Sequence, residues 1–395
     1  MLINGLHAKT GGGVTYLRNM LPLLAADPEL DLTLFLKREQ LPLFSPIDER
    51  VRVRTFDFGG GLFRLLAWEQ TVLPVLARRM GARVTFSPAN FGPLLAPGPV
   101  ILLRNALEVA KEESRPAKRL YWAGLSLMTR LSLLGCRRAI AVSEYARRAL
   151  SRGFGNKTTV IHHGLSPLFH PTFQPKTAPP FLLVVADIYV QKNLHGLIDA
   201  LPGIVAAHPE VHLFIAGREV DPDYAAGLRR RIAALGLDNA VLFLGGVAPD
   251  TLNDLYNGCT VFVFPSTVET FGNPLVEAMA CGACIASSNT TAMPEILGEA
   301  GCYFDPADPA DMTARILSLL GDEALRAERG RAALARAQRF SWAGTAEAVA
   351  RVLKEAGAAD GKPVLLWVWL AAVLALYLAQ FGNYVHSLAA LLGLG

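Results

Sequence analysis

Strong charge of either sign is missing from this sequence, and cysteine is scarce. The 395 residues contain 38 lysines and arginines against 34 aspartates and glutamates, so the formal net charge is only +4. Neutralising a nucleic-acid backbone requires a concentrated basic surface, and we therefore expect no nucleic-acid partner. Cysteine occurs five times. An odd number without paired spacing favours reduced thiols in a cytoplasmic setting over a disulfide framework.

Signatures of several other protein classes are also absent. The segment "TGGGVTY" at residues 10–16 lacks the GxGxxG spacing of dinucleotide-binding proteins, and no serine lies in a GxSxG elbow. "CGAC" at residues 281–284 has no second CxxC to complete a zinc site, so we expect buried thiols there. The opening "MLINGLHAKTGGG" lacks the charged start and long apolar core of a secretory signal.

What the chain does contain is a regular alternation of short apolar runs and segments with helical spacing. Apolar residues make up 52% of a chain long enough for two domains of roughly 150–200 residues. The predicted strands are "LINGLH", "DLTLFL", "VRVRTF", "RVTFSP", "PVILLR", "RAIAVS" and "TVIHH", then "FLLVVA", "VHLFIAG", "AVLFLGG", "VFVFP", "ACIASS" and "CYFD". Such alternation indicates an α/β fold with two doubly wound parallel sheets.

A proline-rich segment divides the two sets of strands. "SPLFHPTFQPKTAPP" at residues 166–180 shows little periodicity and reads as a linker. We place the domains at residues 1–170 and 176–340, a further helix at 341–358, and a hydrophobic tail at 363–395. Parallel sheets bind ligands beyond the carboxyl ends of their strands, so we expect a cleft between the two domains.

The stretch "STVETFGNPLVEAMACG" at residues 266–282 sets two carboxylates around a helix start. The buried run "CTVFVFP" precedes it, Asn273 is a suitable N-cap, and Pro274 suits the first helical position. Glu269 then lies on the loop and Glu277 one turn into the helix. Either Glu277 merely favours the positive end of the helix dipole, or the helix amides bind an anion while both carboxylates hold hydroxyl groups of the same ligand.

Three more segments lie where a predicted strand gives way to a turn or helix. The glycine turn that includes Gly12 and Gly13 follows the first strand, where it binds a ligand closely or serves only as a tight turn. Lys192 and Asn193 begin a helix in the second domain, and the lysine either meets a diphosphate or is solvated. Arg218 ends the next strand with the same ambiguity.

A DxD spacing occurs once in the predicted second domain. "DPDY" at residues 221–224 has the spacing that single-domain, metal-dependent sugar transferases use for a divalent ion. Pro222 and the helix that follows favour a turn and a helix cap instead, so we expect no metal site. An alternative that uses Asp221 and Asp223 for a metal predicts loss of activity in EDTA.

Taken together, these motifs resemble family 4 of the glycosyltransferases, the glycosyl transferases group 1, which have the GT-B fold. The resemblance covers about residues 1–350 and is strongest from Phe181 to Asp305. "VETFGNPLVEAMACGACIAS" matches the family block E-x-F-G-x-x-x-x-E-A-M-A-x-G almost throughout, and "AVSEYARRAL" and "VIHHGLSPLF" match the end of its first domain. "FSWAGTAEAVARVL" resembles the closing helix that crosses back to the first domain.

That resemblance implies retaining transfer of a sugar from a nucleotide-sugar donor, without a metal or another cofactor. It assigns catalytic roles to Glu269, beside the donor sugar, and to Lys192, which would stabilise the leaving diphosphate together with the helix amides. The donor-binding residues that it implies are Gly12, Gly13, Asn193, Arg218, Val247, Phe271, Gly272, Asn273, Pro274, Leu275 and Glu277. Among these, Glu277 would hold the ribose hydroxyls, and the first domain would face the acceptor.

Two positions depart from the family pattern. Asp187 stands where the family commonly has an arginine that pairs with the diphosphate, and an acid there repels phosphate. Either Arg218 or Asn193 compensates, or donor affinity is low. The frequent His-Asp pair of the first domain is replaced by Arg104-Asn105. These departures motivate an alternative function, a catalytically silent family member that serves as a membrane assembly partner.

Two apolar segments predict contact with a membrane. After Lys362 no charged residue follows, and residues 364–384 would span about 31 Å as a helix, just enough for a bilayer core. This tail spans the membrane, lies on it, or packs on the protein. A second segment, residues 118–138, is an apolar helix flanked by basic residues suited to anionic lipids. We therefore predict membrane lipids as partners, a lipid-linked glycan or polysaccharide as acceptor, and the cytoplasmic face of the cell membrane as the location.

Overall fold

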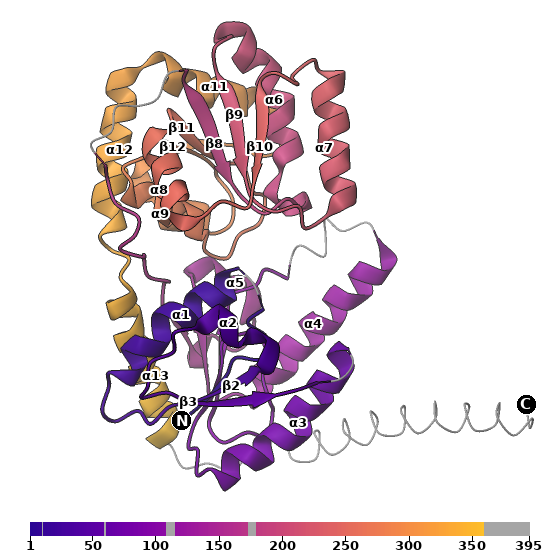
Figure 1. The fold of residues 1–395 in the computed structure, drawn as a ribbon, viewed down its shortest axis with the longest axis vertical. Coiled ribbons are helices and arrows are strands. Elements are labelled where there is room, and N and C mark those ends of the chain that lie inside the picture. The colour runs from indigo at the N-terminus through magenta and orange to yellow at the C-terminus, as the bar shows by residue number, and fades with distance from the viewer. Residues whose placement is uncertain (10, 59–60, 108–114, 173–178, 359–395) are drawn as a thin grey trace, which may run out of the picture.

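The structure is a computed structural model in which two parallel sheets lie one above the other (Figure 1). It describes residues 1–9, 11–58, 61–107, 115–172 and 179–358. The predicted tail at 363–395 lies outside the described residues, as does part of the predicted linker. Among the described helices, none is both long enough and apolar enough to cross a membrane.

The first sheet has seven strands in the order β3-β2-β1-β4-β5-β6-β7, and every neighbouring pair is parallel. Its strands are β1 (Leu2–Asn4), β2 (Thr33–Lys37), β3 (Arg52–Phe56), β4 (Thr85–Ser87), β5 (Pro99–Leu103), β6 (Arg138–Ala141) and β7 (Thr158–Val160). Each corresponds to one apolar run of the first half of the chain. Parallel strands need crossover connections, and helices provide most of these.

The second sheet has six parallel strands in the order β10-β9-β8-β11-β12-β13. They are β8 (Phe181–Val185), β9 (His212–Ala216), β10 (Val241–Gly245), β11 (Val261–Phe264), β12 (Ile285–Ser288) and β13 (Cys302–Phe304). The four residues of β11 are all buried, as expected for a central strand covered on both faces.

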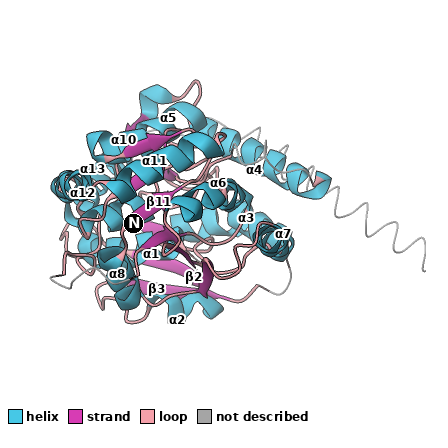
Figure 2. Ribbon diagram, turned by 90° about the horizontal axis from the view of Figure 1, so that it is seen from above, coloured by secondary structure: helices cyan, strands magenta, loops and turns pink. Residues whose placement is uncertain are grey.

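Helices surround both sheets, as the view from above shows (Figure 2). Those of the first half are α1 (Gly12–Ala25), α2 (Leu41–Phe44), α3 (Leu62–Arg79), α4 (Pro116–Gly135) and α5 (Glu144–Leu150). Those of the second half are α6 (Leu194–Ala207), α7 (Pro222–Ala234), α8 (Pro249–Gly258), α9 (Asn273–Ala280), α10 (Met293–Leu297), α11 (Pro309–Gly321), α12 (Glu323–Ala337) and α13 (Trp342–Ala358). The order of the strands in each sheet reverses near its middle, which is where open α/β sheets bind ligands.

The last described helix ties the two halves together. After α12, which packs on the second domain, the chain crosses back to the first domain, where α13 packs on α1 and on β5 and β6 (Figure 1). Gly164 allows this close approach, because a Cβ atom there would lie 2.2 Å from the backbone nitrogen of Trp342. The Glu295 carboxylate adds a polar link by accepting hydrogen bonds from the first backbone amides of α5, at 2.8 and 3.0 Å. The cleft between the sheets therefore has a defined geometry.

Candidate active site

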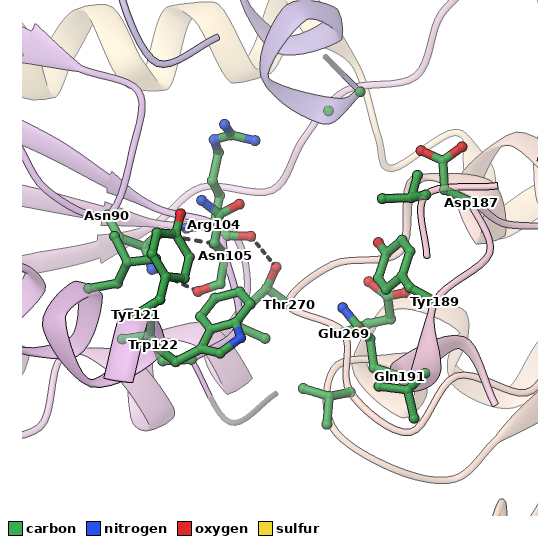
Figure 3. Close-up of a pocket in the computed structure, with 18 of the residues that line it drawn as sticks. Asn90, Arg104, Asn105, Tyr121, Trp122, Asp187, Tyr189, Gln191, Glu269 and Thr270 are labelled. Atoms are coloured by element: carbon green, nitrogen blue, oxygen red, sulfur yellow. Dashed lines mark hydrogen bonds between the residues drawn. The ribbon is translucent and has the colours of Figure 1, made fainter. Parts of the chain in front are cut away.

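A cavity of about 670 Å³ lies between the carboxyl ends of the two sheets. The first half of the chain lines it with His7, Lys9, Gly11, Gly12, Asn90, Phe91, Arg104, Asn105, Ala106, Leu107, Arg115, Lys118, Tyr121, Trp122, Leu125 and Thr129. The second half lines it with Asp187, Tyr189, Val190, Gln191, Lys192, Arg218, Val220, Asp221, Val268, Glu269 and Thr270. Figure 3 shows the two walls facing each other.

Lys192 and Glu269, the two residues predicted to be catalytic, form an ion pair on the second-domain wall. They follow β8 and β11, which are neighbours in the sheet, so the two loops meet although 77 positions separate the residues. The two side chains are only 11% and 17% exposed. A charge pair so far removed from water interacts strongly with any charged ligand beside it.

The Lys192 ammonium remains protonated in this setting. Burial by itself would lower the pKa of Lys192, but the Glu269 carboxylate and the Tyr189 hydroxyl outweigh burial and raise that pKa above its ordinary value. The aromatic rings of Tyr189 and Phe264 also lie 5.5 and 5.9 Å from the ammonium nitrogen. The second-domain wall therefore presents a fixed cation beside a carboxylate.

Arg218 is held by Asp187, the residue that departs from the family pattern. Strands β8 and β9 pair with Val185 opposite Ala216, so the residues two positions later lie side by side. The Arg218 guanidinium donates to Asp187 at 2.8 Å, and the Arg218 amide donates to the same carboxylate at 3.0 Å. Burial raises the pKa of Asp187, but these hydrogen bonds outweigh it and lower that pKa overall. The acid thus neutralises the arginine that was expected to compensate for it.

On the opposite wall, Arg104 lies behind the glycine turn. Its guanidinium is so close that a Cβ atom on Gly13 would stand 2.6 Å from it, and one on Gly12 would stand 3.8 Å away. Burial lowers the pKa of Arg104 to about 10, which still leaves the side chain charged at neutral pH. Gly11 caps α1 with a positive φ of 56°, a conformation that favours glycine.

The Arg104 loop is fixed by hydrogen bonds within and between domains. Asn90 accepts from the backbone amides of Arg104 and Asn105 at 2.9 and 3.0 Å and donates to the Asn105 carbonyl at 2.7 Å. The Thr270 hydroxyl, from the second domain, donates to the Arg104 carbonyl (Figure 3). Because Thr270 directly follows Glu269, this contact sets the spacing of the two walls beside the Lys192–Glu269 pair.

Glu277 lies outside the cavity lining and contacts Tyr256. Its carboxylate accepts a hydrogen bond of 2.9 Å from the Tyr256 hydroxyl of α8. Burial raises the pKa of Glu277 to about 7, although the tyrosine hydroxyl works against that rise. The side chain is partly buried, and its predicted contact with ribose hydroxyls remains a prediction.

Helix α9 begins one position differently from our prediction. Gly272 is the N-cap, with φ 85°, and Asn273 is the first helical residue, so the predicted Asn273 cap is wrong. The reason is a tertiary contact, since the Asn273 side-chain oxygen accepts from His163 Nδ1 at 3.1 Å. Burial lowers the pKa of His163 to about 4, so its ring is a neutral donor. Pro274 follows as the second helical residue.

Of the predicted donor-binding residues and catalytic residues, Gly12, Lys192, Arg218 and Glu269 line the cavity. The following do not line it: Gly13, Asn193, Val247, Phe271, Gly272, Asn273, Pro274, Leu275 and Glu277. Phe271 and Leu275 are buried core side chains, which leaves only their backbone for ligand contact. The Asn193 side chain donates to the Pro306 carbonyl at 2.8 Å, and Asn193 adopts a left-handed φ of 51°. Val247 follows β10, away from the cavity lining.

Asp221 has a role unrelated to metal binding. It caps α7 and accepts hydrogen bonds from two residues of the first domain, from Arg115, the N-cap of α4, at 2.6 Å and from Lys118 of α4 at 3.3 Å. Chiefly through the Arg115 hydrogen bond, the pKa of Asp221 is lowered to about 2. No group of three or more His, Cys, Asp or Glu side chains among the described residues could hold a metal ion.

Several residues of the first-domain wall were not predicted from the sequence as site residues. His7 and Asn90 lie in no motif that we singled out for a site, and Tyr121 and Trp122 of α4 were noted only as part of the apolar segment 118–138. The position of His7 at the end of the predicted strand "LINGLH" was the one available signal, because strand ends line the cleft in this kind of sheet.

The match to a family model lies in the second half of the chain. Residues 168–336 match the family described as Glycosyl transferases group 1. The serotype-specific mannosyltransferase WbdA of Escherichia coli is 36% identical over 198 residues, which cover 50% of this chain and 24% of WbdA. The O-antigen chain mannosyltransferase B of the same organism is 34% identical over 166 residues, 41% of this chain and 42% of that protein. The matches thus span less than half the length of these relatives.

The fold extends over both halves. The Anabaena protein Alr3699/HepE, solved in complex with UDP-glucose, superimposes with a TM-score of 0.69 over 90% of this chain and 99% of its own, at 22% sequence identity. This likeness confirms the predicted GT-B fold with two Rossmann-like domains.

Proposed function

We propose that this protein is a retaining glycosyltransferase that moves a sugar from a nucleotide-sugar donor to a lipid-linked or polysaccharide acceptor. The observation that carries the proposal is the buried Lys192–Glu269 ion pair, which faces the glycine turn and Arg104 across a cavity between two Rossmann-like domains. The match of residues 168–336 to the family Glycosyl transferases group 1 and the similarity to two mannosyltransferases support the reaction class.

The cations of the cavity suit the charge that develops during transfer. The bond between the anomeric carbon and the diphosphate oxygen breaks, so negative charge grows on the leaving group. Lys192 and Arg104 provide fixed positive charge on the two walls, and Glu269 suits the positive character of the sugar carbon. The acceptor oxygen forms the new bond on the same face, and its proton passes to the departing diphosphate. No separate general base is then required.

Helix α4 supports the proposed lipid-linked acceptor. Leu120, Leu127 and Leu134, seven residues apart, are 77%, 59% and 49% exposed, and so form one apolar stripe. Lys118 and Tyr121 of the same helix line the cavity. A helix that exposes leucines beside basic residues suits an anionic membrane surface, and a lipid-linked acceptor there would be close to the cavity. We propose the cytoplasmic face of the cell membrane as the location.

The test is donor turnover with a matched pair of variants. Purified protein is incubated with a panel of UDP- and GDP-sugars, with and without octyl glycosides as acceptors, and release of nucleoside diphosphate is measured. We expect Glu269→Gln to lose most of the turnover and Glu210→Gln, at an exposed site outside the cavity, to keep it. Equal turnover by both variants would overturn the assigned site.

A catalytically silent assembly partner is the second candidate, and the Asp187–Arg218 pair favours it. An arginine neutralised by an acid attracts a diphosphate less than a free one does. This candidate predicts no turnover of any donor in the panel, together with retained binding to anionic vesicles. Vesicles of phosphatidylglycerol and phosphatidylcholine, compared with pure phosphatidylcholine, test that binding.

A further inference from the structure

A histidine and a buried glutamate form a pair on the first-domain wall that the proposed chemistry does not yet use. His7 follows β1, and its Nε2 lies 2.8 Å from the Glu69 carboxylate of α3. Glu69 is completely buried, whereas the His7 side chain is 14% exposed and lines the cavity. The Phe91 ring stands edge-on to the imidazole, with 4.8 Å between ring centroids.

The surroundings of Glu69 fix which nitrogen of His7 carries the proton. One carboxylate oxygen accepts from the Asn4 side-chain amide at 2.5 Å, and the other faces Nε2. A carboxylate only accepts hydrogen bonds, so Nε2 is the donor and the neutral ring keeps a lone pair on Nδ1. Within the part of the chain that the structure describes, no hydrogen bond engages Nδ1.

We infer that His7 accepts a hydrogen bond from a hydroxyl of the sugar acceptor through Nδ1, and that Glu69 is the positioning residue that holds the ring. The inference rests on the proposed function and adds a contact on the acceptor side. A buried carboxylate that orients an imidazole also selects its tautomer, so the ring presents an acceptor atom at a fixed place.

The rest of this wall suits an acceptor sugar better than a donor phosphate. Phe91 stands edge-on to His7, and the rings of Tyr121 and Trp122 line the same cavity. Aromatic rings pack against the carbon-bound hydrogens of a sugar, and the few polar groups between them fix its orientation. The lone pair of His7 would repel a phosphate oxygen but accept a hydroxyl hydrogen.

His7→Gln is the sharpest variant, because the glutamine amide still donates to Glu69 while the ring nitrogen Nδ1 is removed. The readout is the ratio of sugar transfer to octyl α-mannoside or octyl β-glucoside over donor hydrolysis without acceptor. We expect this ratio to fall roughly 5- to 10-fold, the usual worth of one hydrogen bond. Glu69→Gln replaces a charged partner by a neutral one and should lower the ratio about 2- to 5-fold.

Coupling between the two variants separates a role in acceptor binding from a role in folding. In the His7→Gln background, Glu69→Gln should change the ratio no further, since its effect acts through the ring. His208→Gln, at an exposed His-Glu pair of 3.4 Å outside the cavity lining, is the control and should keep the wild-type ratio. An unchanged ratio in His7→Gln would overturn the inference about His7 and leave the proposed function intact. Absence of both reactions in the wild-type protein overturns the proposed function and the inference with it.

Discussion

The two domains contribute to one cavity in different ways. The second domain contributes residues from three short stretches, 187–192, 218–221 and 268–270, which follow the adjacent strands β8, β9 and β11. The first domain contributes residues scattered over many elements, from His7 after β1 to Thr129 on α4. The predicted donor side is therefore built from local motifs, whereas the predicted acceptor side depends on how helices distant in the sequence pack together.

The same difference appears in the charged pairs. Lys192 pairs with Glu269 between two loops that follow neighbouring strands of one sheet, at positions that the family motif already marked. His7 pairs with Glu69 from a helix that no motif marked. The four predictions below test residues of these two walls and the buried Glu277 beside the second one, from the largest expected effect to the smallest.

Lys192→Met should cause the largest loss, because it removes the fixed cation of the donor wall while keeping an unbranched side chain. We expect the turnover number for nucleoside diphosphate release to fall roughly 100- to 1000-fold. Lys354→Met is the matched control. That lysine also contacts two carboxylates, Asp27 at 2.8 Å and Glu29, but it lies outside the cavity lining. Retention of a tenth or more of the turnover by Lys192→Met would contradict the assigned role.

Glu277→Gln should change how stability depends on pH. Because burial raises the pKa of Glu277 from 4.5 to about 7, the folded protein holds a proton that the unfolded chain has lost between these values. The free energy of unfolding of the wild type, relative to Glu277→Gln, should therefore fall as pH rises from about 4.5 to 7. The total change should be roughly 1–3 kcal/mol.

Urea unfolding at pH 5, 6, 7 and 8 measures this difference. Glu355→Gln is the control, because its carboxylate is 54% exposed and lies 3.8 Å from Arg138. If the free energies of unfolding of the wild type and Glu277→Gln change in parallel with pH, the Glu277 carboxyl is ionised in the folded protein throughout this range.

Gly13→Ala tests whether the glycine turn and Arg104 act as one unit. The added Cβ atom would stand 2.6 Å from the guanidinium, so the arginine must move. We expect turnover to fall roughly 5-fold, and much less in an Arg104→Met background, a coupling of about 1 kcal/mol. Gly344→Ala on α13, where no neighbouring atom lies within 4 Å, should leave turnover unchanged. If the losses of turnover caused by Gly13→Ala and Arg104→Met are additive, the glycine turn and Arg104 act independently.

Asp187→Asn should have the smallest effect and the opposite sign. The variant removes a negative charge from the cavity and releases Arg218, whose side chain is 53% exposed. Affinity for UDP or GDP, measured by calorimetry, should rise about 2- to 5-fold, since exposed ion pairs are weak. Asp199→Asn breaks a comparable pair with Arg231 outside the cavity lining and should leave affinity unchanged. Weaker binding by Asp187→Asn would show that this acid supports the donor site.

Sequence analysis predicted the architecture well and the site only in part. Every predicted apolar run overlaps one strand, because buried parallel strands are continuous apolar segments in the sequence. The placement of Lys192 and Glu269 followed from family motifs. The start of α9 was misjudged, since the contact of Asn273 with His163 comes from another domain. Local propensity contains no information on such a contact.

The sequence by itself determined the order of strands and helices and the two-domain division, and it marked Lys192 and Glu269 as candidate site residues. Periodicity and motif spacing are local properties, and they suffice for these features. Only the tertiary structure decided that Asp187 holds Arg218, that Glu69 holds His7, and that Arg104 stands behind the glycine turn. The reason is geometric. The sheets and the helices around them bring together residues that are distant in the chain, and burial then sets the charge and hydrogen-bond partners of each.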